Sequence, residues 1–231
     1  MNNIFIILKK QIKDTLKNKA VLIQFVMFPA MAFIMTKSVK IEGMPSDFFV
    51  NMFSVMYVGM APLVAVSAII SEEKEKNTLR VLMMADVTPG QYLAGIGGYV
   101  FLACMAGAAF FCALSGREGF REKGLFLLIM AVGILASMVL GAAIGVGTAN
   151  QMAATSVTVP VMMIFSFLPM LSMFNETIKK IAEITYSQQI SLLFNGLGEN
   201  YVRSVMIVAA NMIVFGGLFM LLYKKGGLCR G

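Results

Sequence analysis

The chain has 231 residues, of which 58% are hydrophobic and 13% are charged, and its formal net charge is +7. A water-soluble domain is not expected, because its surface needs more polar residues than this composition supplies. The basic residues flank long apolar runs without forming one stripe, so we expect no nucleic-acid partner. Histidine is absent and the three cysteines follow no ligand or disulfide spacing, so we expect no metal site and no disulfide framework.

The first predicted element, over residues 1–19, is an amphipathic helix lying in the headgroup layer of a membrane. Its apolar residues repeat at helical spacing along one face, and its lysines lie away from that face. A solvated basic leader is the alternative. The apolar residues are Ile4, Phe5, Leu8, Ile12 and Leu16, and the lysines are Lys9, Lys10, Lys13 and Lys17.

Six apolar runs are long enough to cross the hydrocarbon core, which takes about 20 helical residues. They cover approximately residues 20–36, 48–70, 91–114, 124–148, 152–174 and 201–223. With an interior amino terminus, eleven Lys and Arg residues lie inside and eight outside, in agreement with the positive-inside rule. The sequence therefore predicts an all-α membrane protein with one domain over 1–231, six transmembrane helices and both termini in the cytosol.

Several residues within the spans point to packing or to a transport path. Pro29, Pro62, Pro160 and Pro169 are expected to kink their helices, and G-x-x-x-G spacing in the fourth span (141 and 145) predicts close helix contact. Methionines recur every four residues in the first two spans; they suit ordinary packing, the lining of a path for apolar cargo, or Cu(I) binding. The candidate path residues are Met27, Met31, Met35, Met52, Met56, Met60, Pro160 and Met163.

The most polar internal segment joins the second and third spans, over residues 71–90. Ser71 is a predicted N-cap, with acidic residues in the first helical turn and a Glu72–Lys76 pair four residues apart. The segment then becomes apolar, which predicts a face covered by a partner protein or by the bilayer surface. Thr88 and Pro89 predict the start of the next helix.

The segment at 175–200, before the last span, is too polar to cross the membrane and too apolar to remain in water. We expect two short helices that dip into the outer leaflet as a re-entrant exterior segment. An amphipathic surface loop is the alternative.

The run "SEEKEKNTLRVLMMADVTPGQYLAG", residues 71–95, resembles the signature that links the second and third spans of type-2 ABC transporter permeases. Asn77 stands where the family frequently has glycine. The resemblance extends over most of the chain, although "YSQQIS" replaces the Asn-Pro often found before the sixth span. The matching residues are Glu72, Glu73, Glu75, Thr78, Leu79, Leu82, Val87 and Pro89.

The resemblance implies the membrane-spanning permease of an ATP-driven exporter, with a cargo such as a drug, an antimicrobial peptide or a lipid-like molecule. It implies two copies of a cytosolic ATPase, and a second permease, identical or homologous, around a path built from the first, second and fifth spans. The coupling helix at 71–90 would dock on the ATPase. Its contact residues would be Glu72, Glu73, Glu75, Lys76, Thr78, Leu79, Arg80, Leu82 and Met83.

Catalysis is not expected in this chain. It contains no G-x-x-x-x-G-K-[ST] phosphate loop, so we expect no cofactor here and assign ATP and Mg to a separate ATPase. An ion-coupled carrier is a weaker alternative, because such carriers keep ionisable groups near the bilayer centre and the first five spans contain none. A passive membrane scaffold is a further alternative.

Overall fold

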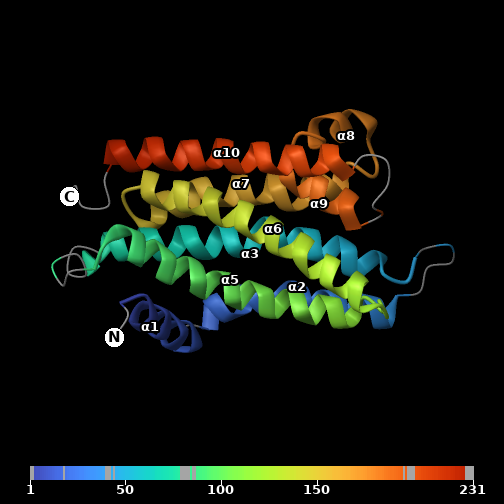
Figure 1. The fold of residues 1–231 in the computed structure, drawn as a ribbon, viewed down its shortest axis with the longest axis horizontal. Helices are drawn as coiled ribbons and strands as arrows, with labels where there is room; N and C mark the ends of the chain where they lie inside the picture. The colour runs from blue at the N-terminus through green and yellow to red at the C-terminus, as the bar shows by residue number, and fades with distance from the viewer. Residues whose placement is uncertain are drawn as a thin grey trace.

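The computed structural model describes residues 3–17, 19–39, 43, 45–78, 84, 87–194, 196 and 201–226. These residues form nine α-helices and no β-strand, in agreement with the predicted all-α class. The long helices lie alongside one another in a single bundle (Figure 1). The helices are α1 (Asn3–Lys17), α2 (Lys19–Ser38), α3 (Phe48–Glu75), α5 (Pro89–Leu114), α6 (Phe120–Gly147), α7 (Gln151–Leu171), α8 (Glu176–Ala182), α9 (Tyr186–Phe194) and α10 (Tyr201–Gly226).

Five helices, α3, α5, α6, α7 and α10, are long and apolar enough to cross a membrane. They correspond to five of the six predicted spans. The remaining span, predicted near residues 20–36, corresponds to α2, whose described apolar part is the shorter stretch Leu22–Ser38. A sixth crossing therefore stays a prediction. The four prolines predicted within spans lie inside α2, α3 and α7.

Helix α3 is the centre of the bundle and contacts α2, α5, α6, α7 and α9. Of its most apolar stretch 78% is buried within the protein, against 11% for α10, so most of the surface of α10 is exposed. Polar contacts add to this core: the hydroxyls of Ser67 on α3 and Thr158 on α7 lie 2.8 Å apart. Likewise, Ser137 of α6 and Tyr186 of α9 lie 2.6 Å apart.

Glycines let the backbones around α3 approach closely. A Cβ atom added at Gly141 of α6 would lie 2.5 Å from the carbonyl oxygen of Leu63, and one at Gly145 would lie 2.9 Å from Cβ of Ile70. Real Cβ atoms do not approach neighbours this closely, so larger residues would push the helices apart. The close contact predicted from the G-x-x-x-G spacing is confirmed, and its partner is α3.

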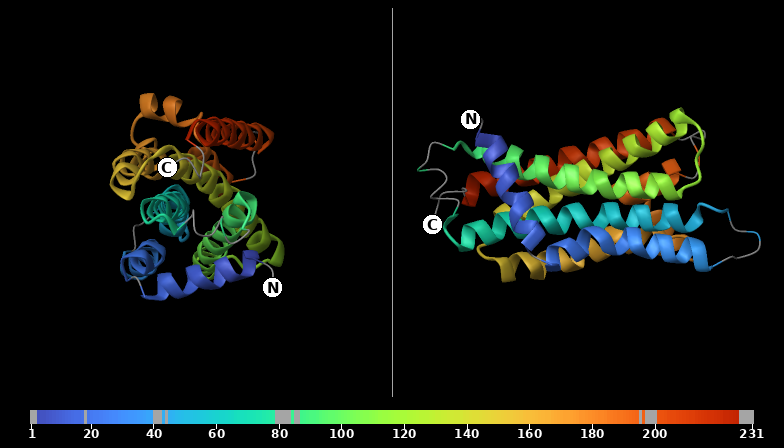
Figure 2. Two further views of the ribbon diagram at one scale, coloured as in Figure 1. Left: turned by 90° about the vertical axis from the view of Figure 1, so that its left-hand side faces the viewer. Right: turned by 90° about the horizontal axis from the view of Figure 1, so that it is seen from below.

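The two ends of the bundle hold different segments (Figure 1 and Figure 2). Helix α1, the last turn of α3, the first turn of α5 and the last turn of α10 lie together at one end, which we call the α1 end. The end of α2, the start of α3 and the connection from α5 to α6 lie at the opposite end, with α8. Both ends of the described chain therefore lie on the same side, as an even number of crossings requires.

Helix α1 crosses the α1 end at an angle to the long helices and packs against α5 (Figure 2). The face that packs overlaps the predicted apolar face only in part. Leu8 of that face is half-buried against the core, but the most buried residues are Ile7 and Gln11, at 3% and 6% exposure, whereas Phe5 and Ile12 are 60% and 43% exposed. The amphipathic helix is thus present. One of its sides contacts protein, and the side with Phe5 and Ile12 is exposed.

The segment before α10 contains two short helices, α8 and α9, as predicted. Asn175 caps α8, because its Oδ1 accepts hydrogen bonds from the backbone N–H groups of Thr177 and Ile178. Helix α9 is buried against α3, α6, α7 and α10, so the alternative of a surface loop is wrong for this part. Its insertion in the outer leaflet stays a prediction.

The opposite end is held by Arg117, from the connection between α5 and α6. Its guanidinium donates hydrogen bonds to Asn51 Oδ1 at 3.2 Å and to Asp47 Oδ2 at 3.4 Å. The same group lies 4.6 Å from the ring centroid of Phe126, a cation–π distance. One side chain thus connects the start of α3 to α6.

Candidate functional site

The candidate site is the charged turn, which we define as Glu72–Lys76 at the α1 end. It forms the last turn of α3 and not the first turn of a new helix, so the prediction of Ser71 as an N-cap is wrong. Ser71 lies inside α3, and its hydroxyl donates a hydrogen bond to the carbonyl of Ala68 at 3.1 Å. No glycine or proline separates Ser71 from the apolar run before it, so the helix continues through it.

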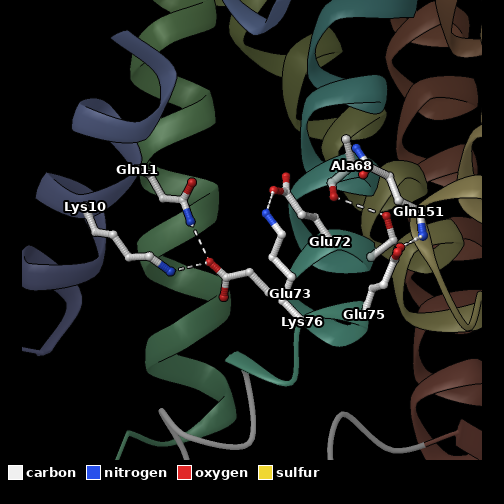
Figure 3. Close-up of polar contacts among 9 residues, drawn as sticks. Lys10, Gln11, Ala68, Glu72, Glu73, Glu75, Lys76 and Gln151 are labelled. Carbon is white, nitrogen blue, oxygen red and sulfur yellow. Dashed lines mark hydrogen bonds and ion pairs between the residues drawn. The ribbon is translucent and has the colours of Figure 1, made fainter. Parts of the chain in front are cut away.

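Glu73 connects the charged turn to α1 (Figure 3). Its Oε1 accepts hydrogen bonds from Lys10 Nζ at 2.9 Å and from Gln11 Nε2 at 2.8 Å. The Glu73 side chain is only 9% exposed. A buried carboxylate requires such partners, because desolvation disfavours its charge.

Lys74 connects the charged turn to the end of α6. Its ammonium group donates hydrogen bonds to the carbonyls of Val146 at 2.8 Å and Thr148 at 2.5 Å. Carbonyls in the last turn of a helix have no partner within that helix. Lys74 therefore caps α6 and places a positive charge at the negative end of its dipole.

Glu75 connects the charged turn to the start of α7. Its Oε2 accepts a hydrogen bond from the backbone N–H of Gln151 at 2.8 Å, as Figure 3 shows. That N–H belongs to the first turn of α7, where N–H groups lack helical partners and negative charge is favourable. Asn150 supplies a second cap, since its Oδ1 accepts from the N–H of Ala153 at 2.8 Å.

Consecutive residues therefore contact three different helices. Side chains that follow one another on an α-helix point about 100° apart, so Glu73, Lys74 and Glu75 reach α1, α6 and α7 in turn. Three carboxylates at the end of a helix are unfavourable for its dipole, and the contacts of Glu73 and Glu75 offset this. The predicted pair of Glu72 with Lys76 is also present, on the exposed side of the turn.

Asn77 ends α3. Its φ angle of 55° lies in the left-handed region, which glycine adopts freely and asparagine more readily than most residues. The backbone N–H of Asn77 donates to the carbonyl of Lys74 at 3.1 Å. The position therefore needs a residue that tolerates positive φ, as glycine also would.

The rest of the predicted coupling segment is described only in part. Thr78 is half-buried, whereas Leu79, Arg80, Leu82 and Met83 lie outside the described residues. The predicted start of the next helix is confirmed. Thr88 and Gln91 form a reciprocal capping box, with Thr88 Oγ1 accepting from Gln91 N–H at 3.3 Å and Gln91 Oε1 accepting from Thr88 N–H at 3.1 Å.

The candidate path residues do not converge on one cavity. Met27 and Met31 are 39% and 43% exposed on α2, and Met163 is 52% exposed on α7. Pro160 is also exposed on α7, and Met35 and Met60 are half-buried. Met52 and Met56 do line one small cavity between α3 and α7. Two methionines that sequence reasoning missed, Met170 and Met173, line the same cavity.

The residues described by the structure contain no cluster of three Cys, Asp or Glu side chains that could hold a metal ion. The comparison with protein families gives one match, to the ABC-2 family transporter protein, over residues 2–223. No individual curated protein matches the chain. The family match begins in α1 and ends within α10, and it therefore covers all the apolar helices described above. The chain belongs to the ABC-2 transporter family, and it is a membrane-embedded permease, the transport subunit that is not itself catalytic.

Proposed function

We propose that this permease is the membrane half of an ATP-driven exporter and that the segment from Glu72 to Met83 docks on a separate cytosolic ATPase. The charged turn carries this proposal. It is the first part of the docking segment, and its contacts reach α1, α6 and α7. A displacement of the segment by the ATPase would therefore be passed to three helices through charged side chains, without a flexible linker between them.

The docking segment runs along the chain from the last turn of α3 towards the start of α5. Asn77 stops α3 immediately after the charged turn, and Thr88 with Pro89 starts α5 with fixed geometry. The docking segment thus begins within α3 and is followed along the chain by α5. ATP and Mg would bind to the ATPase, two copies of which would act on two permease chains, identical or homologous.

The path for cargo would lie between two permeases, along α2, α3 and α7. The exposed apolar side chains of α2 and α7, including Met31 and Met163, support a second copy or a lipid-like cargo on this side. Methionine adapts to varied apolar partners, which supports an amphipathic cargo. The orientation with both termini in the cytosol, in the plasma membrane of a bacterium, completes the proposal.

Substitution of Leu79 by aspartate tests the docking role. We expect the permease to fold, and the ATPase to lose stimulation and co-purification, because a carboxylate buried at the contact without a partner is unfavourable. Leu79→Ile, which keeps an apolar side chain, is the matched control. Co-purification at wild-type yield together with unchanged stimulation in Leu79→Asp and Leu82→Asp would remove the docking role.

Substitution of Met56 and Met60 by alanine tests the path. The expected result is reduced export of an amphipathic cargo from reconstituted vesicles, with the complex still assembled. Met206→Ala with Met220→Ala, at exposed positions of α10, is the control. Equal transport by the two double variants would contradict the path assignment.

A further inference from the structure

An apolar groove separates α2 from α5 near the α1 end. It has an open volume of about 440 Å³, and its lining includes Ile12 of α1, Leu22 and Pro29 of α2, and Ala103, Gly107 and Phe110 of α5. The residues of α5 share one helical face, because they are spaced by three or four positions. The small side chains of Ala103 and Ala106 leave space between the two helices.

The length of the groove matches one membrane leaflet. Its lining on α5 begins at Tyr99 and ends at Phe110, and eleven helical steps of about 1.5 Å give roughly 16 Å. The hydrocarbon core is about 30 Å thick, so one leaflet contributes about 15 Å. The groove begins beside α1 and therefore spans the leaflet on which α1 lies. A single acyl chain has the right shape and polarity for it.

Free positive charge lies at the mouth of the groove. Ile12 lines the groove, and Lys9 lies about 60° from it around α1, three residues earlier. Lys13 is the next residue along the helix, and both lysines are exposed. Neither forms an ion pair within the described part of the chain, whereas Lys10 is paired with Glu73. An anionic headgroup would complement these two charges.

We propose that the groove holds one phospholipid with an anionic headgroup, its acyl chain between α2 and α5 and its phosphate beside Lys9 and Lys13. This inference goes beyond the transport role and does not depend on an ATPase. Apolar burial favours any acyl chain, and the lysines provide the selection by headgroup, since each basic residue near a membrane surface strengthens binding to anionic lipid about fivefold. The lipid would fix the position of α1 relative to α2 and α5.

Native mass spectrometry of the delipidated full chain, released from detergent micelles, tests this proposal. The probes are dioleoyl phosphatidylglycerol and dioleoyl phosphatidylcholine, which share their acyl chains and differ in headgroup charge. We expect one phosphatidylglycerol per chain, bound more tightly than phosphatidylcholine. Lys9→Gln with Lys13→Gln should weaken phosphatidylglycerol binding about thirtyfold and leave phosphatidylcholine unchanged. Lys224→Gln with Lys225→Gln, on α10, is the charge-matched control and should have no effect.

A second variant tests the acyl site. Ala106, which also lines the groove, is replaced by phenylalanine, and Ala210→Phe on the exposed side of α10 is its control. Loss of contact with about two methylene groups corresponds to about tenfold weaker binding of both lipids. Equal affinity of the wild-type chain for the two lipids would overturn the proposal. Unchanged lipid binding in Ala106→Phe would also overturn it. If that variant instead converts a dimer to monomers, the groove is an interface between copies, and the proposal is likewise overturned.

Discussion

Replacement of Glu73 by leucine tests whether the charged turn holds α1 in place. The change removes the carboxylate that accepts hydrogen bonds from Gln11 and Lys10. Gln11 is 6% exposed, so its amide would be buried without an acceptor. A hydrogen bond to a charged group contributes about 1.5–3 kcal/mol, and a partly exposed ion pair adds only about 0.2–1 kcal/mol. We expect a loss of about 2–3 kcal/mol in the docking of α1, roughly thirtyfold or more in the docked-to-undocked ratio.

Hydrogen exchange of the intact protein in lipid nanodiscs measures this docking directly. The backbone amides of residues 5–13 should exchange faster in Glu73→Leu, while those of α6 should be unchanged. Glu72→Leu is the matched control in the same turn: its pair with Lys76 is exposed on both sides, and such i,i+4 pairs contribute only about 0.3–0.5 kcal/mol.

The double variant Gln11→Leu with Glu73→Leu separates the hydrogen bond from general damage. Removal of both polar partners leaves no unsatisfied amide. The loss of α1 protection from hydrogen exchange should therefore be smaller in the double variant than the sum of the losses in the two single variants. Wild-type exchange of α1 in Glu73→Leu, or the same acceleration in Glu72→Leu, would refute the reasoning.

Three further predictions concern the helix ends and contacts. Asn77→Gly should retain the stability of the wild type, whereas Asn77→Val should lose about 1–2 kcal/mol because a branched side chain disfavours positive φ; unfolding in mixed detergent micelles measures both. Gly141→Ala should lower the free energy of unfolding by about 1–3 kcal/mol through the clash with Leu63. Gly217→Ala, with open space around it, should raise it by about 0.5–1 kcal/mol, so the same assay should give changes of opposite sign. Lys74→Met should cost about 1–3 kcal/mol by leaving the α6 carbonyls unpaired, and exchange at the end of α6 should report it.

Features with a strong local cause could be predicted from the sequence. The apolar runs determine the long helices, because burial of the backbone in a membrane requires helical hydrogen bonding. Gly141 and Gly145 indicate a close contact, although not which helix makes it. Thr88 followed by Pro89 fixes the start of α5 through capping chemistry that involves only neighbouring residues.

The prediction at Ser71 failed for a reason that the sequence also contains. An N-cap requires the preceding residues to be non-helical. The residues directly before Ser71 contain no helix breaker, so the helix continues through it. Asn77 is the residue that can adopt the left-handed conformation, and it could have been recognised as the stop. The acidic residues then belong to the end of one helix and not to the start of another.

The partners of the charged turn on other helices could not be predicted. Glu73 and Gln11 are 62 residues apart in the chain, and Glu75 and Gln151 are 76 residues apart. Such pairs depend on the rotation of α3 among its neighbours, which one sequence without related sequences does not specify. The same holds for the face of α1: Ile7 and Gln11 pack inward because α5 lies there, although the apolar periodicity favoured Phe5 and Ile12.

The central position of α3 has a consequence for synthesis. Ser67 is translated 91 residues before its partner Thr158, which at about 5–20 residues per second is an interval of roughly 5–20 seconds. Throughout that interval Thr158 has not been synthesised, so the Ser67 hydroxyl needs another partner. A serine hydroxyl can bond to the carbonyl one turn earlier in its own helix, so it tolerates surrounding lipid until translation supplies α7.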